Sequence, residues 1–152
     1  MKEFLTFGSK QTKKAGASFA EEILEKSFPR KKAVLIGLTG NLGGGKTTFV
    51  QGFAEGMGIK GKVLSPTFVL VKKFPLEDAG KAKTLYHIDC YRIGSKDLLS
   101  LGFKKIISDP KSVILVEWAD RVKEIFPKGA FLVSFSFLSE NKRMIKIKWE
   151  KL

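Results

Sequence analysis

The sequence has little cysteine, little arginine and no long apolar run. Its single cysteine, Cys90, rules out an internal disulfide, which argues against a disulfide-stapled secreted scaffold and for a reducing compartment. No apolar stretch approaches the ~18 residues that a membrane span needs. The first residues also lack the apolar core and the small-residue cleavage site of a secretory signal. We therefore expect a cytoplasmic protein with no membrane association.

Arginine is scarce although the chain is strongly basic. The 28 Lys and Arg residues against 15 Asp and Glu give a net charge of +13, and only four of the 28 are arginine. Arginine contacts phosphates and bases bidentately, whereas lysine is a hydrated point charge. The lysines are spread along the chain, which fits either a lysine-rich solvated surface or an attraction for RNA or an acidic partner. Charge alone does not decide the function.

The hydrophobic pattern alternates between strands and helices over one domain, residues 1–152, without repeats or linkers. The periodicity predicts strands over 3–7, 33–38, 67–74, 84–91, 113–117, 131–138 and 144–149. It predicts helices over 10–27 with Ser9 as N-cap, 46–57, 95–101 with Ser95 as N-cap, and 119–125. This order indicates an α/β three-layer domain of the P-loop NTPase type. Its sheet is mixed and mostly parallel, and a C-terminal antiparallel hairpin completes it.

One segment carries a specific chemistry. Residues 40–47 read Gly-Asn-Leu-Gly-Gly-Gly-Lys-Thr and meet the G-x-x-x-x-G-K-[ST] pattern of the P-loop, between a predicted strand and a predicted helix. Backbone N–H groups of such a loop and of the helix start can hold a triphosphate, and the alternative is a glycine-rich connection without a ligand. Lys46 would reach the β- and γ-phosphates, and the Thr47 hydroxyl would ligate Mg²⁺. We expect ATP to contact Asn41, Leu42, Gly43, Gly44, Gly45, Lys46, Thr47 and Thr48.

Two acids are candidates for the metal and the attacking water. Glu117 ends the apolar strand 113–117, and an ionised carboxylate there is costly unless it faces a cation or a donor. Asp89 lies on the same face of its predicted strand as His87 and Tyr91, with apolar residues on the other face. For each acid the alternative is a solvent-facing strand end or a surface ion pair, and the sequence does not divide the catalytic and metal-binding roles between them.

The remaining candidates allow two interpretations each. Thr67, after Ser65-Pro66, is either part of a switch-like loop that senses the γ-phosphate or part of a plain turn. Trp118 is either core or a cover over the site, and His87 is more often structural than catalytic. We expect Cys90 to be a small buried hydrophobe rather than a reactive thiol.

Four blocks of the chain resemble the TsaE (YjeE) family, small bacterial P-loop ATPases of tRNA threonylcarbamoyladenosine biosynthesis. The blocks are residues 40–48, Ser-Pro-Thr-Phe at 65–68, His-Ile-Asp-Cys-Tyr-Arg at 87–92 and Leu-Val-Glu-Trp at 115–118. The last two blocks carry the resemblance, because the P-loop alone does not name a family. Two positions depart from it: the family usually has Asp where this chain has Asn41, and Ala where it has Gly44. Asn41 removes that negative charge from the loop.

The resemblance implies a slow, partner-stimulated ATPase that acts with a TsaB–TsaD pair. TsaD attaches the threonylcarbamoyl group to adenosine beside the tRNA anticodon, and the ATPase resets the complex, so tRNA would touch this chain indirectly or weakly. By the same resemblance, Lys46 and Thr47 bind phosphate and Mg²⁺, Thr67 lies in the switch-like loop and Trp118 lies beside the nucleotide. Asp89 and Glu117 are then the catalytic and metal-binding acids, together with Thr47 as a metal ligand.

Two other functions share the motif. A small-molecule kinase would transfer the phosphoryl group to a nucleoside or nucleotide, but such kinases carry an arginine-bearing lid, and only Asp120-Arg121 suggests one here. A basic RNA-binding module with a vestigial P-loop would bind RNA in a salt-dependent manner that ATP does not affect. A GTPase is disfavoured because the N-K-x-D pattern is missing.

Overall fold

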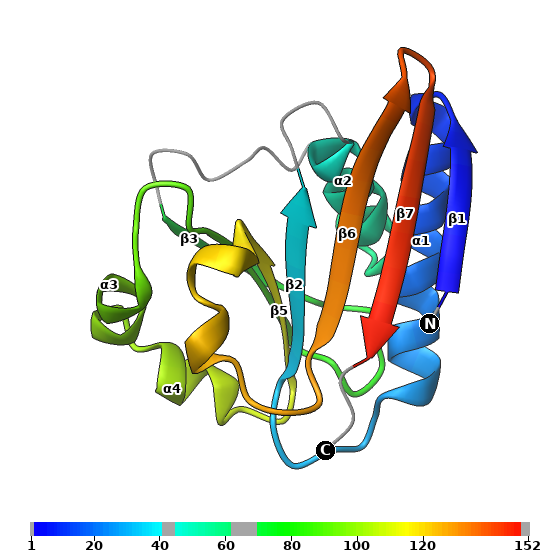
Figure 1. Cartoon of the computed structure of the whole chain (residues 1–152). Coiled ribbons are helices and arrows are strands. Elements are labelled where there is room, and N and C mark those ends of the chain that lie inside the picture. Colours follow the sequence, from blue (N-terminus) through cyan, green and yellow to red (C-terminus); the bar gives the residue numbers. More distant parts are fainter. Residues whose placement is uncertain (1, 41–44, 62–69, 150–152) are drawn as a thin grey trace.

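The computed structural model describes residues 2–40, 45–61 and 70–149. Within these residues it has one seven-stranded sheet in the order β1-β7-β6-β2-β5-β4-β3 (Figure 1). The strands are β1 (Lys2–Phe7), β2 (Val34–Gly40), β3 (Val71–Pro75), β4 (Thr84–Asp89), β5 (Ser112–Glu117), β6 (Phe131–Ser139) and β7 (Lys142–Trp149).

The centre of the sheet is parallel and its margins are antiparallel. Strand β2 pairs in parallel with β5 on one side and β6 on the other, and β5 pairs in parallel with β4. Strands β3, β7 and β1 run antiparallel to their neighbours, and β6 and β7 form the expected C-terminal hairpin. The expected mixed sheet is therefore confirmed.

Helices cover both faces of the parallel strands. The long helices α1 (Ser9–Lys26) and α2 (Lys46–Gly56) enclose one core with alternate residues of β2 and β5. The short helices α3 (Ser95–Ser100) and α4 (Phe103–Ile107) and the 3₁₀ turns η1 (Ala119–Arg121) and η2 (Lys123–Ile125) enclose a second core on the opposite face. Because both faces are covered, β5 is buried along its whole length, as continuous apolar strands of parallel sheets are.

The two long helices cross closely at glycine. A Cβ on Gly52 of α2 would lie 1.9 Å from the Lys13 carbonyl oxygen of α1, and one on Gly16 would lie 2.1 Å from the Phe49 carbonyl oxygen. Only glycine lets the backbones approach to this distance. The contact fixes α2, and with it the residues at its first turn, against the sheet.

Both expected helix N-caps are wrong. The N-caps of α1 and α3 are Gly8 and Gly94, not Ser9 and Ser95. Gly8 has φ 94°, a left-handed conformation that serine rarely adopts, and the N–H of Gly94 is instead bonded by the Asp97 carboxylate.

The predicted helix 119–125 is two 3₁₀ turns, because Val122 between them leaves the helical backbone conformation, with φ -130° and ψ 16°, and buries its side chain in the core. Helix α4 was not expected, since five residues are too short to show a helical period. The strand predicted from Thr67 is observed from Val71, and residues 67–69 lie outside the described residues.

Candidate functional site

Three neighbouring strands end at one edge of the sheet, and polar residues follow there. Strand β2 ends at Gly40, β4 at Asp89 and β5 at Glu117. In the parallel register Asp89 lies opposite Glu117, and Glu117 lies opposite Leu38 of β2. Helix α2 begins beside this edge (Figure 1), so the first turn of a helix and two strand-end carboxylates meet at one place. Ligands of open α/β sheets bind at this position.

Lys46 is the first residue of α2 and is 94% buried, with only 6% of its surface exposed. The preceding residue, Gly45, has the left-handed φ of 94° that turns the chain into the helix. Lys46 Nζ donates to the Gly40 carbonyl oxygen at 2.8 Å and lies 3.8 Å from the centroid of the Trp118 ring. Burial lowers the pKa of Lys46, and the charges of Glu117, Asp120 and Asp89 oppose that shift. The site thus holds a desolvated ammonium group with carboxylates close enough to act on it.

The two strand-end carboxylates are also buried, Asp89 with 6% and Glu117 with 5% of their surfaces exposed. Glu117 Oε2 lies 2.7 Å from His87 Nε2, the distance at which an imidazole N–H donates to a carboxylate. Asp89 Oδ1 accepts the backbone N–H of Tyr91 at 2.9 Å. Among the described residues, Nδ1 of His87 has no hydrogen-bond partner although it is buried. His87 therefore orients Glu117 and keeps one ring nitrogen available.

An aromatic group covers the ammonium of Lys46. Trp118 follows Glu117 with φ 59°, a left-handed backbone conformation that costs an L-residue about 1–2 kcal/mol. This turn lays the indole 5.0 Å from the Tyr91 ring and places both rings within reach of Arg121, whose Cζ is 5.5 and 5.2 Å from their centroids. Strain of this kind is common at functional sites, where surrounding contacts hold it in place.

The structure brings together the predicted site residues Gly45, Lys46, Asp89, Glu117 and Trp118. Thr47 is exposed and Thr48 half-buried on the first turn of α2. The other residues expected at the nucleotide, Asn41, Leu42, Gly43, Gly44 and Thr67, lie outside the described residues.

Sequence reasoning did not assign Tyr91 to the site, and it considered Arg121 only as part of a kinase-type lid. The signal available for Tyr91 was its position on the same strand face as His87 and Asp89. For Arg121 it was the rarity of arginine in a chain with only four of them.

The side chains that are present fit a phosphate and a magnesium ion. A buried ammonium at a helix start suits a phosphate, and carboxylate and hydroxyl oxygens suit Mg²⁺. Across the described part of the chain, no group of three or more His, Cys, Asp or Glu side chains could hold a metal by itself. Magnesium bound here would therefore need further ligands, and Thr47, phosphate oxygens and water are of the right kind.

Cys90 lies next to Asp89 but takes no part in this site. Its side chain is fully buried in the second core, and burial together with the charge of Asp89 raises the pKa of its thiol to about 12. The expectation of a small buried hydrophobe is confirmed.

The fold and the site define a class: α/β proteins with a G-x-x-x-x-G-K-T sequence between the central strand and a helix, and acids at the ends of adjacent strands. Within this class, the family of the threonylcarbamoyl adenosine biosynthesis protein TsaE matches residues 8–145. The chain belongs to the TsaE family.

Individual relatives agree with this assignment. The tRNA threonylcarbamoyladenosine biosynthesis protein TsaE of Haemophilus influenzae is 34% identical over 125 residues, covering 82% of this chain and 75% of that protein. The protein of the same name in Rickettsia typhi is 30% identical over 143 residues, covering 93% and 90%. The crystal structure of Bacillus subtilis YdiB matches with a TM-score of 0.74 at 30% identity, covering 98% of this chain and 84% of that one.

Within the described residues no helix is both long and apolar enough to cross a membrane.

Proposed function

We propose that this protein binds Mg·ATP at the site around Lys46, hydrolyses it slowly, and acts with a TsaB–TsaD-type pair in the threonylcarbamoylation of tRNA adenosine next to the anticodon. One observation carries the nucleotide part of the proposal. The ammonium group of Lys46 is desolvated at the start of α2. The buried carboxylates of Asp89 and Glu117 lie at the ends of the neighbouring strands β4 and β5. Membership of the TsaE family and the names of its relatives support the tRNA part.

Each side chain has a task in this proposal. Lys46 exchanges the Gly40 carbonyl oxygen and the Trp118 ring for phosphate oxygens, and the backbone N–H groups at the start of α2 bind the same phosphates. Thr47 and one of the two acids, Asp89 or Glu117, would provide the oxygens for Mg²⁺, which when bound neutralises phosphate charge. Of the two acids, the one that does not hold the metal orients the attacking water. His87 holds Glu117 in place for either task.

We expect the isolated chain to hydrolyse ATP slowly, because the arginines near its site are engaged in other contacts. P-loop enzymes gain several orders of magnitude in rate from a positioned cation, which is often supplied by a partner. Two arginines lie near the site and both have other contacts: Arg121 lies against the rings of Trp118 and Tyr91, and Arg143, beside Gly45, donates to the Ser139 carbonyl oxygen at 2.6 Å. We therefore expect the partner pair to raise turnover.

The test is binding and hydrolysis of Mg·ATP by wild type, Lys46→Ala, Asp89→Asn and Glu117→Gln, each with and without the TsaB–TsaD pair. Loss of one charge-assisted contact is worth about 1.5–3 kcal/mol, so Lys46→Ala is expected to weaken binding by roughly 10- to 150-fold. One of the two acid variants is expected to bind Mg·ATP normally without turning it over.

The control is Lys104→Ala, which removes an equal charge from the exposed surface of α4 and is expected to behave as wild type. Equal turnover with and without the partner pair would refute the stimulated ATPase. Wild-type protein that shows neither heat nor thermal protection with millimolar Mg·ATP would refute the nucleotide site itself. Formation of threonylcarbamoyladenosine on a tRNA transcript, lost with Lys46→Ala, tests the tRNA role.

A further inference from the structure

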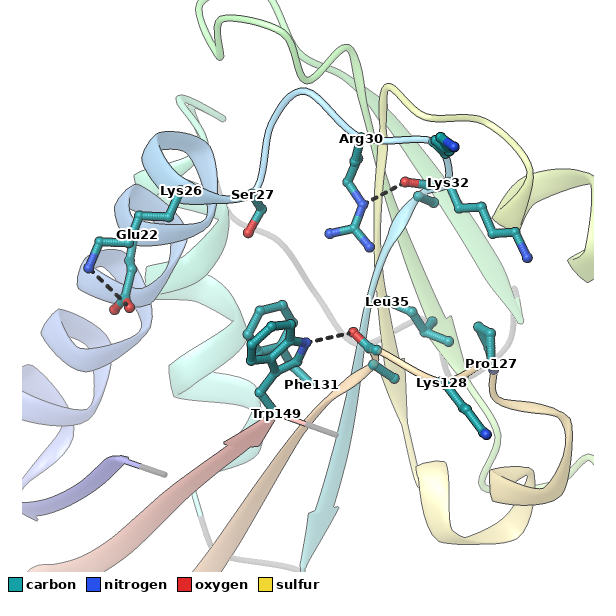
Figure 2. Close-up of a pocket in the computed structure, with 14 residues that line it drawn as sticks. Glu22, Lys26, Ser27, Arg30, Lys32, Leu35, Pro127, Lys128, Phe131 and Trp149 are labelled. Carbon is teal, nitrogen blue, oxygen red and sulfur yellow. Dashed lines mark hydrogen bonds and ion pairs between the residues drawn. The ribbon is translucent and has the colours of Figure 1, made fainter. Parts of the chain in front are cut away.

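A cavity lies at the end of the sheet opposite the Lys46 site, where β2 and β6 begin. It has a volume of about 750 Å³, and the C-terminal turn of α1, the segment 30–33, the segment 127–130 and the end of β7 line it (Figure 2). Seven residues of β2 separate this end from the P-loop end, a length of about 20 Å at the rise of a strand. The volume is in the range of ligand-binding pockets.

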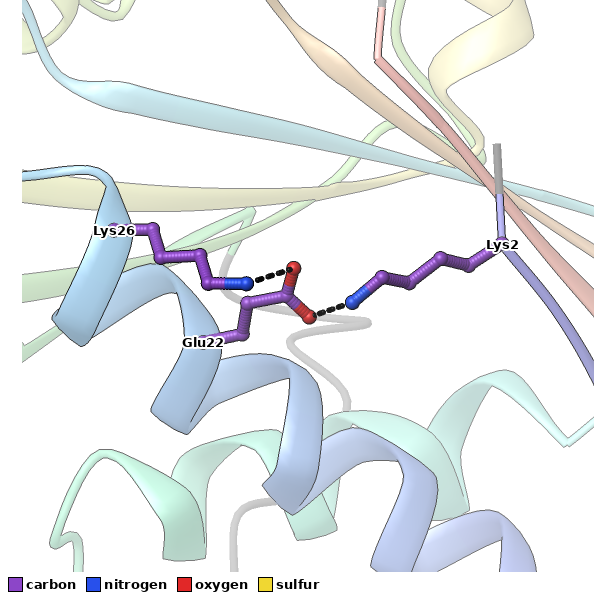
Figure 3. A network of polar contacts seen from close by, with 3 residues as sticks. All are labelled: Lys2, Glu22 and Lys26. Atoms are coloured by element: carbon purple, nitrogen blue, oxygen red, sulfur yellow. Dashed lines mark hydrogen bonds and ion pairs between the residues drawn. The ribbon is translucent and has the colours of Figure 1, made fainter.

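Most of the charged residues that line this basal pocket are basic. Five of its side chains are basic and one is acidic: Lys26, Arg30, Lys31, Lys32, Lys128 and Glu22. The one carboxylate is already engaged, because Glu22 forms ion pairs with Lys2 and with Lys26, the latter at 3.7 Å (Figure 3). The pocket therefore carries an uncompensated positive charge that suits an anion.

Arg30 is held in position for such an anion. Its Nε donates to the Lys32 carbonyl oxygen at 2.7 Å, and the guanidinium points into the pocket (Figure 2). Within the described residues no carboxylate pairs with Arg30, and burial lowers the pKa of its side chain. A half-buried guanidinium fixed through one nitrogen still offers the terminal pair that contacts a phosphate bidentately.

An aromatic surface lies beside these cations. Trp149 is 55% exposed, stacks on Phe131 with ring centroids 6.3 Å apart and an interplanar angle of 21°, and donates its indole N–H to the Gly129 carbonyl oxygen at 3.2 Å. These contacts fix the indole, and its exposed part can accept another flat ring. Base stacking on such a side chain contributes about 1–3 kcal/mol per base.

We propose that the basal pocket binds a segment of single-stranded RNA, with one base on Trp149 and the adjoining phosphate on Arg30. Cations alone would equally attract an acidic peptide, but the pocket joins them to a fixed, exposed indole, and bases use both features. The proposal does not depend on nucleotide binding at Lys46, because the two sites use different residues at opposite ends of the sheet.

The test measures fluorescence anisotropy of a short labelled oligoadenylate with wild type, Arg30→Gln, Trp149→Ala and Trp149→Phe. One phosphate contact or one stacked base lost is expected to weaken binding by roughly five- to 150-fold for Arg30→Gln and for Trp149→Ala. Trp149→Phe retains a stacking ring and is expected to recover most of the affinity. Arg30→Gln is expected to reduce the slope of log K against log salt by about 0.7.

The matched control is Lys104→Gln, an equal loss of charge on α4, which is expected to keep the wild-type affinity within about twofold. Circular dichroism establishes that each variant is folded, without reference to ATP. If Trp149→Ala does not fold, Arg30→Gln decides. The proposal is overturned if Arg30→Gln and Trp149→Ala bind RNA like wild type. It is equally overturned if AMP or an oligoglutamate peptide of equal charge binds the pocket as tightly as the RNA.

Discussion

Lys46 makes two contacts that a bound phosphate would replace, one with the Gly40 carbonyl oxygen and one with the Trp118 ring. An ammonium group 3.8 Å from an indole centroid perturbs the emission of that indole, so departure of Lys46 is expected to change Trp118 fluorescence. The measurement is a titration of Trp149→Phe protein with Mg·ATP, in which Trp118 is the one remaining tryptophan. Addition of Lys46→Ala to this background removes the contact and is expected to abolish the change; an unchanged response there would contradict the assignment.

The thiol of Cys90 gives a second prediction for a single residue. Its pKa is raised from the ordinary value of 9.0 to about 12, so the folded protein keeps the thiol protonated at pH 8, where an unfolded chain has a reactive thiolate fraction. Modification by a disulfide reagent at pH 8 is expected to be roughly 1000-fold slower in the folded protein than in denaturant. Because the folded pKa is the higher one, Cys90 stabilises the fold below pH 9 and this contribution is lost as pH rises toward 12. Fast modification of the native protein would contradict this burial. Cys90→Ala is the control, because it has no thiol and shows the background reaction of the reagent.

The identities of the site residues were more predictable than their contacts. Lys46 belongs to a motif of consecutive residues that can be recognised in the sequence. Glu117 directly follows an apolar run, in which a charged residue is easily noticed. The His87–Glu117 contact joins residues 30 positions apart and depends on the register of β4 against β5, which no local pattern encodes. The position of Arg121 depends on the left-handed turn at Trp118, and large L-residues give no sequence signal for that conformation.

At the scale of elements, the packing of α1 on α2 depends on glycine at the crossing. Gly52→Ala would gain up to about 1 kcal/mol of helix propensity, but its Cβ would lie 1.9 Å from the Lys13 carbonyl oxygen, which is backbone and cannot turn aside. The expected net result is a loss of about 1–3 kcal/mol in the free energy of unfolding, typical of overpacking. Urea denaturation measures it. Ser18→Ala on the exposed surface of α1 is the control and is expected to change stability by less than about 0.5 kcal/mol.

The elements predicted correctly are those whose burial repeats over several residues. Strand β5 and strand β2 show continuous apolar runs because helices cover both faces, and α1 shows one buried stripe. The segment 119–125 was predicted as one helix from its hydrophobic pattern, whereas the Val122 side chain is buried in the second core and the helical backbone is interrupted there. Tertiary contact overrides local propensity in such short segments.

At the scale of the molecule, the parallel sheet separates two chemically different ends. The carboxyl ends of β2, β4 and β5 carry one buried cation and two buried acids, whereas the other end carries an excess of exposed cations and an indole. The net charge of +13 predicted neither arrangement, because it does not say where lysines gather. Lysines gather at the basal pocket because the end of α1, at Lys26, and the segment 30–33 before β2 lie at the same end of the sheet.

This separation predicts that the two sites act independently. Substitutions about 20 Å apart without shared partners are normally additive within about 0.5 kcal/mol. Lys46→Ala is therefore expected to leave the affinity for oligoadenylate within about twofold of wild type, and Arg30→Gln to leave the affinity for Mg·ATP within the same limit. The double variant is expected to show both losses in full. A larger coupling, in either direction, would mean that β2 transmits strain between its ends, since the described residues provide no ion pair or hydrogen bond that links Lys46 to Arg30.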